Sequence, residues 1–299
     1  MSQRRTHRGR GFHLPAITLM LALADLASPA KAEAQSTAVG ACPTEDTGIT
    51  LSPGFCATVF ADNLGHVRHL TVAADGTVYA NSWSGRYYHN DTPPAGGFLL
   101  ALKDTKGTGH ADVVMRFGET AAEGAAGGTG IAFYNNALYA ELNDKIVRYS
   151  LAPGQIVPST GPEVILSGMP LTGDHPMHPF VIDTQGKLFV DSGSATNACQ
   201  AQNRMPDSIG IRPCTELKTR AGIWRYDANK TGQVFSPGER FATGIRNGEG
   251  LAFDAAGALY ATQHGRDQLS QNWPKLYPVC GLNLFHDVEA ARIPSVVRR

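Results

Sequence analysis

Ionisable side chains gather in short loops at a fixed distance before aromatic residues that recur along the chain. Residues 65–68 (GHVR), 175–178 (HPMH) and 246–249 (RNGE) each lie 14 to 11 residues before such an aromatic, and the glycine-rich run 127–130 lies near the corresponding place before another. Asp174-His175 offers a neutral imidazole beside an acid, which suits a general base near neutral pH. Arg246 offers a fixed positive charge for a developing oxyanion or an anionic cofactor. These loops therefore predict a catalytic site with His175, Asp174 and Arg246 as its candidate catalytic residues.

Loops that directly follow the aromatics are polar as well: 81–86 (NSWSGR), 191–197 (DSGSATN) and 263–267 (QHGRD). Taken singly, Arg68 or His264 is better explained as a solvated loop residue, but convergence of the whole set predicts a site. The sequence lacks G-x-S-x-G, the P-loop and G-x-G-x-x-G, which disfavours serine hydrolases, phosphate-cradling enzymes and dinucleotide binding. The glycine run is assigned instead to close backbone packing.

The elements that must position these loops are β-hairpins. Four segments, 70–80, 131–140, 180–190 and 251–261, alternate with period two on both sides of an Asp, Asn or Gly turn. Their terminal aromatics are Tyr79, Tyr139, Phe189 and Tyr260. Further strand candidates lie at 57–64, 97–104, 144–151 and 222–229. About four strands per repeat predict the blades of an all-β propeller, with a β-sandwich as the alternative.

Composition agrees with an all-β chain of many turns. The 299 residues include 33 Gly and 18 Pro, and 26 basic residues balance 26 acidic ones. The balanced charge gives no reason to expect a nucleic-acid partner. No apolar stretch is long enough for a multi-span membrane protein.

The first 34 residues have the layout of a secretory signal peptide, with a basic start, an apolar core and cleavage sites after Ala32 or Ala34. Export to the periplasm or the cell exterior is therefore predicted, with no membrane span in the mature chain. An oxidising compartment permits disulfides. Cys199 and Cys214 are the first candidate pair, and Cys42 and Cys56 are the second.

Four motifs carry a family resemblance: TGDHPMHPFVID, FVDSGSATN, GIRNGEGLAFD and ATQHGRD, which occur in this order. Between about Leu51 and Tyr277 the chain resembles the soluble quinoprotein sugar dehydrogenases, and it is most similar to the glucose/L-sorbosone dehydrogenase group. The resemblance implies a six-bladed propeller that binds pyrroloquinoline quinone (PQQ) and Ca²⁺ and oxidises a sugar or related polyol or aldose, with an external electron acceptor.

The resemblance also implies site residues. His175 would take the substrate hydroxyl proton while hydride passes to the quinone. Arg246 and Asn247 would lie beside the cofactor, and the backbone carbonyls of Gly265 and Arg266 would hold calcium. The glucose enzymes orient the catalytic His with an Asp, but this chain has Ser194 at the matching place, so Asp174 or Asp191 is expected to substitute.

The repeat count and the tail set limits on this interpretation. Four hairpins occupy nearly all of the chain, so about four of six blades are expected between residues 35 and 277. Residues 278–299 lack strand alternation and are predicted to be a disordered, aberrant end of a truncated chain.

Two other functions remain open: a calcium-dependent propeller lactonase or hydrolase, and an inactive truncated propeller that acts as a binding module. The segment 104–112 resembles a calcium loop, but Lys106 and Thr108 leave too few oxygen ligands, so a hairpin turn is predicted there.

Overall fold

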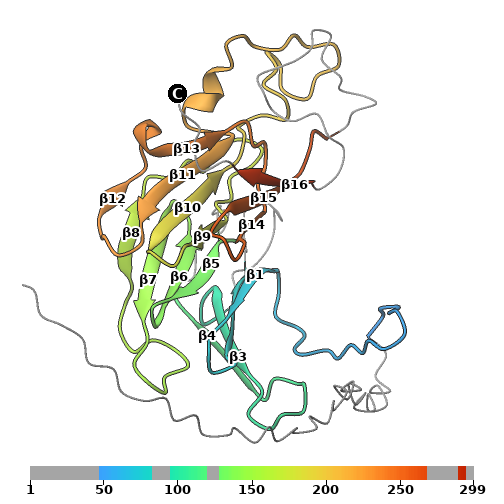
Figure 1. Cartoon of the computed structure of the whole chain (residues 1–299), viewed down its shortest axis with the longest axis vertical. Coiled ribbons are helices and arrows are strands. Elements are labelled where there is room, and N and C mark those ends of the chain that lie inside the picture. Colours follow the sequence, from blue (N-terminus) through green and yellow to red (C-terminus); the bar gives the residue numbers. More distant parts are fainter. Residues whose placement is uncertain (1–46, 83–94, 120–127, 268–288, 294–299) are drawn as a thin grey trace, which may run out of the picture.

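The computed structural model describes residues 47–82, 95–119 and 128–267, together with the backbone of 289–293 (Figure 1). Within these residues the structure is all-β, with four sheets and two short 3-10 helices, η2 (Thr215–Lys218) and η3 (Pro237–Glu239). The all-β prediction is therefore confirmed.

Each sheet corresponds to one blade. Blade 1 contains β1 (Val67–Val72), β2 (Val78–Ser82), β3 (Leu99–Lys103) and β4 (Val113–Phe117). Blade 2 contains β5 (Ile131–Tyr134), β6 (Ala137–Leu142), β7 (Lys145–Ser150), β8 (Glu163–Ser167) and, parallel to β8, β12 (Gln233–Val234). Blade 3 contains β9 (Phe180–Ile182), β10 (Lys187–Ser192), β11 (Gly222–Asp227) and β13 (Arg240–Thr243). Blade 4 contains β14 (Gly250–Phe253), β15 (Leu259–Gln263) and β16 (Glu289–Ile293).

All four predicted hairpins form the two innermost strands of a blade. The tightest turn joins β5 to β6 through Asn135 and Asn136, whose φ angles of 48° and 57° are both left-handed. A two-residue turn of this type matches the right-handed twist of the paired strands, and Asn tolerates positive φ better than most residues. The Asn-Asn pair therefore fixes the register that places Tyr139 inside the blade seam.

The blades pack face to face through the predicted aromatics. Tyr79 stacks on Phe133 of the next blade, with ring centroids 6.0 Å apart and planes 5° from parallel. Tyr139 is buried with Trp224 between blades 2 and 3, and Phe189 packs on Phe253 between blades 3 and 4. Burial of such rings supplies much of the packing energy between sheets.

The innermost strands β1, β5, β9 and β14 follow one another around a common channel. They line a cavity of 530 Å³, to which each of the four contributes residues. This arrangement is a partial β-propeller with four blades, as predicted, and the polar loops that precede these strands lie at one end of the channel.

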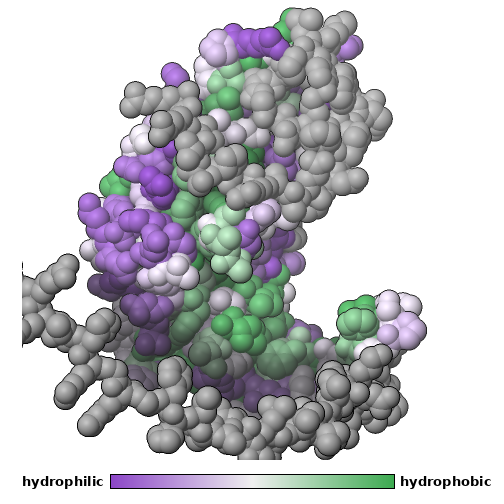
Figure 2. Space-filling model, viewed as in Figure 1, coloured by the Kyte–Doolittle hydropathy of each residue, from purple (hydrophilic) through white to green (hydrophobic). Residues whose placement is uncertain are grey.

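One face of blade 1 has no neighbouring blade among the described residues. The register aligns Leu70 with Ala80 and Leu100, and Val72 with Leu102 and Val114. Leu70, Val72 and Val114 remain more than half exposed. Figure 2 shows hydrophobic surface over the lower part of the molecule, where Figure 1 places β1, β3 and β4.

The prediction of a strand at 57–64 is wrong. Phe60, Ala61 and Leu64 instead lie as an irregular segment against the middle of that open face, packed on the cluster of Ala80, Leu100 and Leu102. Its backbone bends through a left-handed φ of 55° at Asn63. Alternating apolar residues therefore bury one side here without a ladder of strand hydrogen bonds.

The hairpin turn predicted at residues 104–112 forms. The segment 104–112 connects β3 to β4, and its acids are used within the turn: Asp104 accepts hydrogen bonds from the amides of Lys106 and Gly109, and Asp112 accepts from Thr105.

The tail at residues 278–299 was predicted to be disordered, but part of it is a strand, because β16 pairs antiparallel with β15. Strand pairing uses backbone groups, so it does not require the side-chain alternation that the tail lacks.

The predicted signal peptide and the rest of the tail lie outside the described residues. In the part of the chain that is described, no helix has the length and apolarity needed to cross a membrane.

Candidate functional site

His175 lies in the loop before β9 and is almost fully buried, with 5% of its surface exposed. Its ring Nδ1 lies 2.8 Å from the carbonyl oxygen of Ser194 and 3.0 Å from the Ser194 hydroxyl. A carbonyl only accepts hydrogen bonds, so Nδ1 carries the proton and Nε2 keeps its lone pair. Burial and the neighbouring Arg246 charge lower the pKa of His175 to about 4. The imidazole is therefore neutral at physiological pH and able to accept a proton at Nε2.

Ser194 joins His175 to Arg246. Its amide donates to the Arg246 carbonyl at 2.6 Å, while its own carbonyl accepts from His175. Gly193 makes this approach possible, because a Cβ there would lie 2.5 Å from the His175 Cβ. The loop after β10 thus brings together two residues that the sequence separates by 71 positions.

Asp174 was expected to orient the His175 ring, but its carboxylate contacts other residues. Its carboxylate accepts from the Asn203 amide at 3.0 and 3.2 Å and from the Arg204 Nε at 2.8 Å. Its influence on His175 is electrostatic, since the negative charge partly opposes the lowering of the His175 pKa. Backbone and hydroxyl groups of Ser194 take the orienting role that an acid was expected to supply.

Arg246 is buried to 1% exposure, and its guanidinium donates four hydrogen bonds. Nε and Nη2 donate to the Asn197 carbonyl and side-chain oxygens at 2.9 and 2.7 Å, and Nη1 donates to the His264 carbonyl at 3.3 Å. Nη2 also donates to Asp267 at 2.9 Å. Burial lowers the pKa of Arg246 while Asp267 opposes that effect. Asn247, the other predicted cofactor residue, is also buried beside it.

Gly265 and Arg266, the predicted calcium ligands, follow β15 in the same region. Arg266 is buried, and the following residue, Asp267, is exposed. The carbonyl oxygen of Asp267 accepts from the Asn197 side chain at 3.1 Å, and its amide donates to the Asn197 side-chain oxygen at 2.9 Å. The structure therefore brings the 191–197 and 263–267 loops together, as the sequence predicted.

Arg220 is a buried residue that sequence reasoning missed. It donates to the carbonyl oxygens of His175 at 3.3 Å and Gly193 at 3.4 Å, and to Thr172. These contacts tie the loop that carries His175 to the loop that carries Ser194. No motif marked Arg220, because its partners are backbone carbonyls and the Thr172 hydroxyl.

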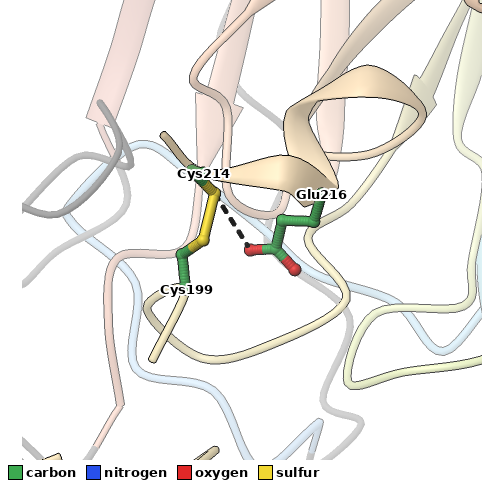
Figure 3. A group of neighbouring side chains, drawn as sticks. All are labelled: Cys199, Cys214 and Glu216. Carbon is green, nitrogen blue, oxygen red and sulfur yellow. Dashed lines mark hydrogen bonds between the residues drawn. A yellow bond between two sulfur atoms is a disulfide. The ribbon is translucent and has the colours of Figure 1, made fainter. Parts of the chain in front are cut away.

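The connection from β10 to β11 holds these loops in place. The predicted disulfide joins Cys199 to Cys214 across this connection (Figure 3). Glu216, whose Oε1 lies 3.9 Å from the Cys214 sulfur, accepts hydrogen bonds from the Thr196 amide and hydroxyl, both at 3.0 Å. Cys199, Cys214 and Glu216 form the only close trio of potential ligand side chains in the described residues. Both sulfurs are in the disulfide, so the trio acts as a structural clip.

Of the second predicted pair, Cys56 is disulfide-bonded, and Cys42 lies outside the described residues.

A buried network at the seam between blades 2 and 3 was also missed. Glu141 at the end of β6 has no exposed surface. Its Oε2 accepts from the Thr129 amide and hydroxyl and the Gly130 amide, each at 2.9 Å, and its Oε1 accepts from the amide and Nδ1 of His178, each at 3.0 Å. Gly130 is required there, since a Cβ would lie 2.6 Å from the His178 carbonyl oxygen. The assignment of the glycine run to close packing is confirmed at this position.

Asp191 occupies the corresponding position at the next seam. It is fully buried, and among the described residues the Gly248 amide is the one group beside its carboxylate that favours the charged form by hydrogen bonding, short of full hydrogen-bond geometry. Burial raises its pKa well above the usual value, and the nearby Glu249 raises it further. Gly248 lies against it, where a Cβ would be 2.6 Å from Oδ1. Burial therefore favours the neutral form of the Asp191 carboxyl, which does not orient His175.

A sequence signal for these seam residues did exist. Asn81, Glu141 and Asp191 each lie two residues after one of the recurring aromatics, Tyr79, Tyr139 and Phe189. Asn81 likewise donates across its seam, to the carbonyls of Gly130 and Glu141. A polar residue at a buried strand position is informative because it must find a partner.

A family model described as TrAA12-like matches residues 49–277, more than half of the chain. Among solved structures, the holo form of the pyranose dehydrogenase PQQ domain from Coprinopsis cinerea is 16% identical with a TM-score of 0.57, and the match covers 76% of this chain and 51% of that one. The calcium structure of the Trichoderma reesei protein of carbohydrate-active enzymes family AA12 is 17% identical with a TM-score of 0.53, covering 73% and 50%.

An iodide structure of the Trichoderma reesei family AA12 protein is also similar, at 16% identity and a TM-score of 0.53, covering 70% of this chain and 48% of that one. The chain thus spans about half the length of these solved structures. At such identities they establish the propeller fold. The comparison with curated proteins found no match.

Proposed function

Because the chain belongs to the TrAA12-like family, we propose that it is a quinoprotein sugar dehydrogenase that oxidises a sugar or a related polyol or aldose. The glucose/L-sorbosone type is the form that its motifs favour. The observation that carries this proposal is the geometry of His175. Its ring is buried and neutral, and its Nδ1 is tied to Ser194, beside the Arg246 charge at the channel mouth.

The residues at this mouth fit PQQ and calcium by their chemistry. PQQ is a planar tricarboxylate, and Arg246 and Asn247 would hold it through charge and amide hydrogen bonds. The backbone carbonyls of Gly265 and Arg266 are hard oxygen donors of the kind that calcium prefers. Bound there, PQQ would supply a hydride-accepting quinone for the oxidation of the substrate carbon.

The protein side chains handle the proton. Nε2 of His175 accepts the proton of the substrate hydroxyl, because Nδ1 is already committed as a donor to Ser194. Arg220 holds the His175 main chain and keeps the ring in this orientation. Asp174 stabilises the imidazolium electrostatically after proton transfer, as its charge favours the protonated ring. An external electron acceptor completes the turnover.

Reconstitution with PQQ and Ca²⁺, followed by dye reduction with glucose and with L-sorbosone, tests the proposal. We expect turnover, and we expect His175→Ala to lower kcat by about 10²–10⁴-fold, the usual contribution of a general base. Glu163→Gln, which alters an exposed ion pair on β8, is the matched control. Cofactor binding without turnover would remove the catalytic part of the proposal, and absence of binding would favour the inactive binding module.

The pH profile gives a separate check on His175. A base whose pKa is about 4 is neutral above that value, so kcat/KM should be flat from pH 6 upward and fall as pH drops through about 4. A profile that falls near the ordinary histidine pKa of about 6.5 would show that the base lies elsewhere.

The same proposal places the protein in the periplasm or outside the cell, with a leader removed after Ala32 or Ala34. N-terminal sequencing of exported protein tests the cleavage position. Recovery of intact chain in the cytoplasm would contradict it.

A further inference from the structure

Two arginines from different loops converge on one carboxylate oxygen at the channel mouth. The Nη2 atoms of Arg246 and Arg204 lie 2.9 and 3.0 Å from Oδ2 of Asp267. The Arg246 side chain is 1% exposed, the Arg204 side chain 34% and the Asp267 side chain 50%. A buried and a part-exposed guanidinium therefore share one accessible anion.

Both arginines are held in place by partners other than Asp267. Arg246 is fixed by the carbonyl and side chain of Asn197 and by the His264 carbonyl. Arg204 is fixed by Asp174, 2.8 Å from its Nε. If the Asp267 carboxylate turned away, the two Nη2 groups would still aim at the place it leaves.

The main chain of Asp267 is anchored independently of its side chain. Its amide and carbonyl pair with the side chain of Asn197 at 2.9 and 3.1 Å. Rotation about the side-chain bonds is thus enough to move the carboxylate into solvent, which it already contacts over half of its surface.

We propose that Arg204 and Arg246 form a clip for a carboxylate group of a ligand, and that Asp267 is an internal placeholder for that group. Guanidinium groups recognise carboxylates through paired, charge-assisted hydrogen bonds, and Asp267 Oδ2 marks where the ligand oxygen would lie. Asp267 and the ligand compete for the same donors. Identification of the ligand with PQQ rests on the proposed function, whereas the clip itself does not.

Three substitutions separate the roles. Asp267→Asn removes the competing charge at nearly constant shape, so carboxylate binding should tighten about tenfold, or about 1.4 kcal/mol. Arg204→Gln and Arg204→Lys remove or misplace one arm of the clip, so binding should weaken by a similar factor. Glu163→Gln is the control, because Glu163 is 52% exposed and pairs with Arg148 at 2.7 Å, far from the mouth.

The probes are benzene-1,3,5-tricarboxylate, a redox-inert tricarboxylate, and PQQ, measured by titration calorimetry on the full chain after treatment with chelating resin. Thermal unfolding of each variant checks that it is folded. The expected order of affinity is Asp267→Asn, then wild type and Glu163→Gln together, then the Arg204 variants. Weaker or unchanged binding by Asp267→Asn overturns the proposal, and so does unchanged binding by both Arg204 variants.

The two probes keep this proposal distinct from the proposed function. If benzene-1,3,5-tricarboxylate follows the expected order and PQQ does not bind, the clip stands and the quinone assignment fails. If neither probe binds wild type or Asp267→Asn, the clip is overturned.

Discussion

Replacing Glu141 with Gln is the sharpest test of what holds the blades together at the channel mouth. The Glu141 carboxylate has no exposed surface and accepts five hydrogen bonds from Thr129, Gly130 and His178. Three of these come from its own blade and two from the loop that enters blade 3. A glutamine keeps one acceptor oxygen and presents two N–H donors in place of the other.

The loss of unfolding free energy in Glu141→Gln follows from the number of donors that lose their acceptor. If the Gln oxygen faces Thr129 and Gly130, its amide nitrogen faces the amide and Nδ1 of His178. The imidazole can move its proton to Nε2 and accept from the new amide, but Nε2 is buried and has no hydrogen-bond partner among the described residues. The moved proton is then stranded, and the His178 amide is still opposed by a donor. A bond to a charged acceptor contributes about 1.5–3 kcal/mol, and a stranded buried donor costs about 1–3 kcal/mol. We expect Glu141→Gln to cost about 2–4 kcal/mol of unfolding free energy.

Urea unfolding followed by circular dichroism measures this loss, and Tm should fall by about 5–15 °C for a domain of this size. Glu163→Gln, at an exposed ion pair, should cost at most about 1 kcal/mol. A loss below about 1 kcal/mol for Glu141→Gln would refute the argument that this carboxylate stabilises the seam.

The pH dependence tests the same residue. Burial alone would raise the pKa of Glu141, but the hydrogen bond from His178 and those from Gly130 and Thr129 hold it below the usual 4.5. A carboxyl whose pKa is lowered on folding contributes stability above its unfolded pKa and loses it as pH falls through the folded value. The difference between wild type and Glu141→Gln should thus be constant above about pH 5 and shrink below 4.5. A difference that stays constant down to pH 3 would contradict this account.

Three further changes have expected outcomes. Asp191→Asn should stabilise the protein at pH 7 by about 1–3 kcal/mol, because burial raises the pKa of Asp191; urea unfolding should show the gain vanishing below about pH 4, and a loss at pH 7 would contradict it. Gly130→Ala should cost about 1–3 kcal/mol by overpacking, since its Cβ would meet the His178 carbonyl; an unchanged urea midpoint would show that the seam can relax. Replacing Cys199 and Cys214 by Ser should cost about 3 kcal/mol for a loop of 15 residues; if wild type and the double variant unfold alike without reductant, the disulfide contributes nothing.

The hairpins could be predicted because period-two alternation and Asn or Gly turns specify local pairing. The segment 57–64 shows where that signal stops. Its apolar side chains alternate as in a strand, yet they bury against Ala80, Leu100 and Leu102 across a sheet face that no neighbouring blade covers among the described residues. Alternation reports that one side is buried. It does not report whether a partner strand is available.

The candidate site could likewise be predicted only in part from the sequence. His175 and Arg246 were identified because counting back from each aromatic locates the loop that enters an inner strand. The partner of the His175 ring was expected to be an acid, and it is the carbonyl and hydroxyl of Ser194. A backbone carbonyl has no residue type, so it leaves no mark in a sequence. The contact of Arg204 with Asp267 spans 63 positions between two irregular loops, and no periodic pattern encodes it.

The polar residues at equivalent positions of the three seams differ in their hydrogen-bond partners. Asn81, Glu141 and Asp191 pair across their strands with His69, Gly130 and Pro179 at the same level of the channel. The first two find partners in the next blade and act as structural links. Among the described residues Asp191 has only the Gly248 amide beside it, and a buried carboxyl with so few hydrogen bonds lowers stability unless a group outside the chain supplies more. The loops that carry His175 and Arg246 lie at the same seam, so the buried Asp191 carboxyl lies beside the candidate site. The stabilisation of Asp191→Asn at pH 7 should therefore shrink once a ligand occupies the mouth and supplies Asp191 with a partner. A gain of equal size in the bound and free protein would show that Asp191 is only a packing defect.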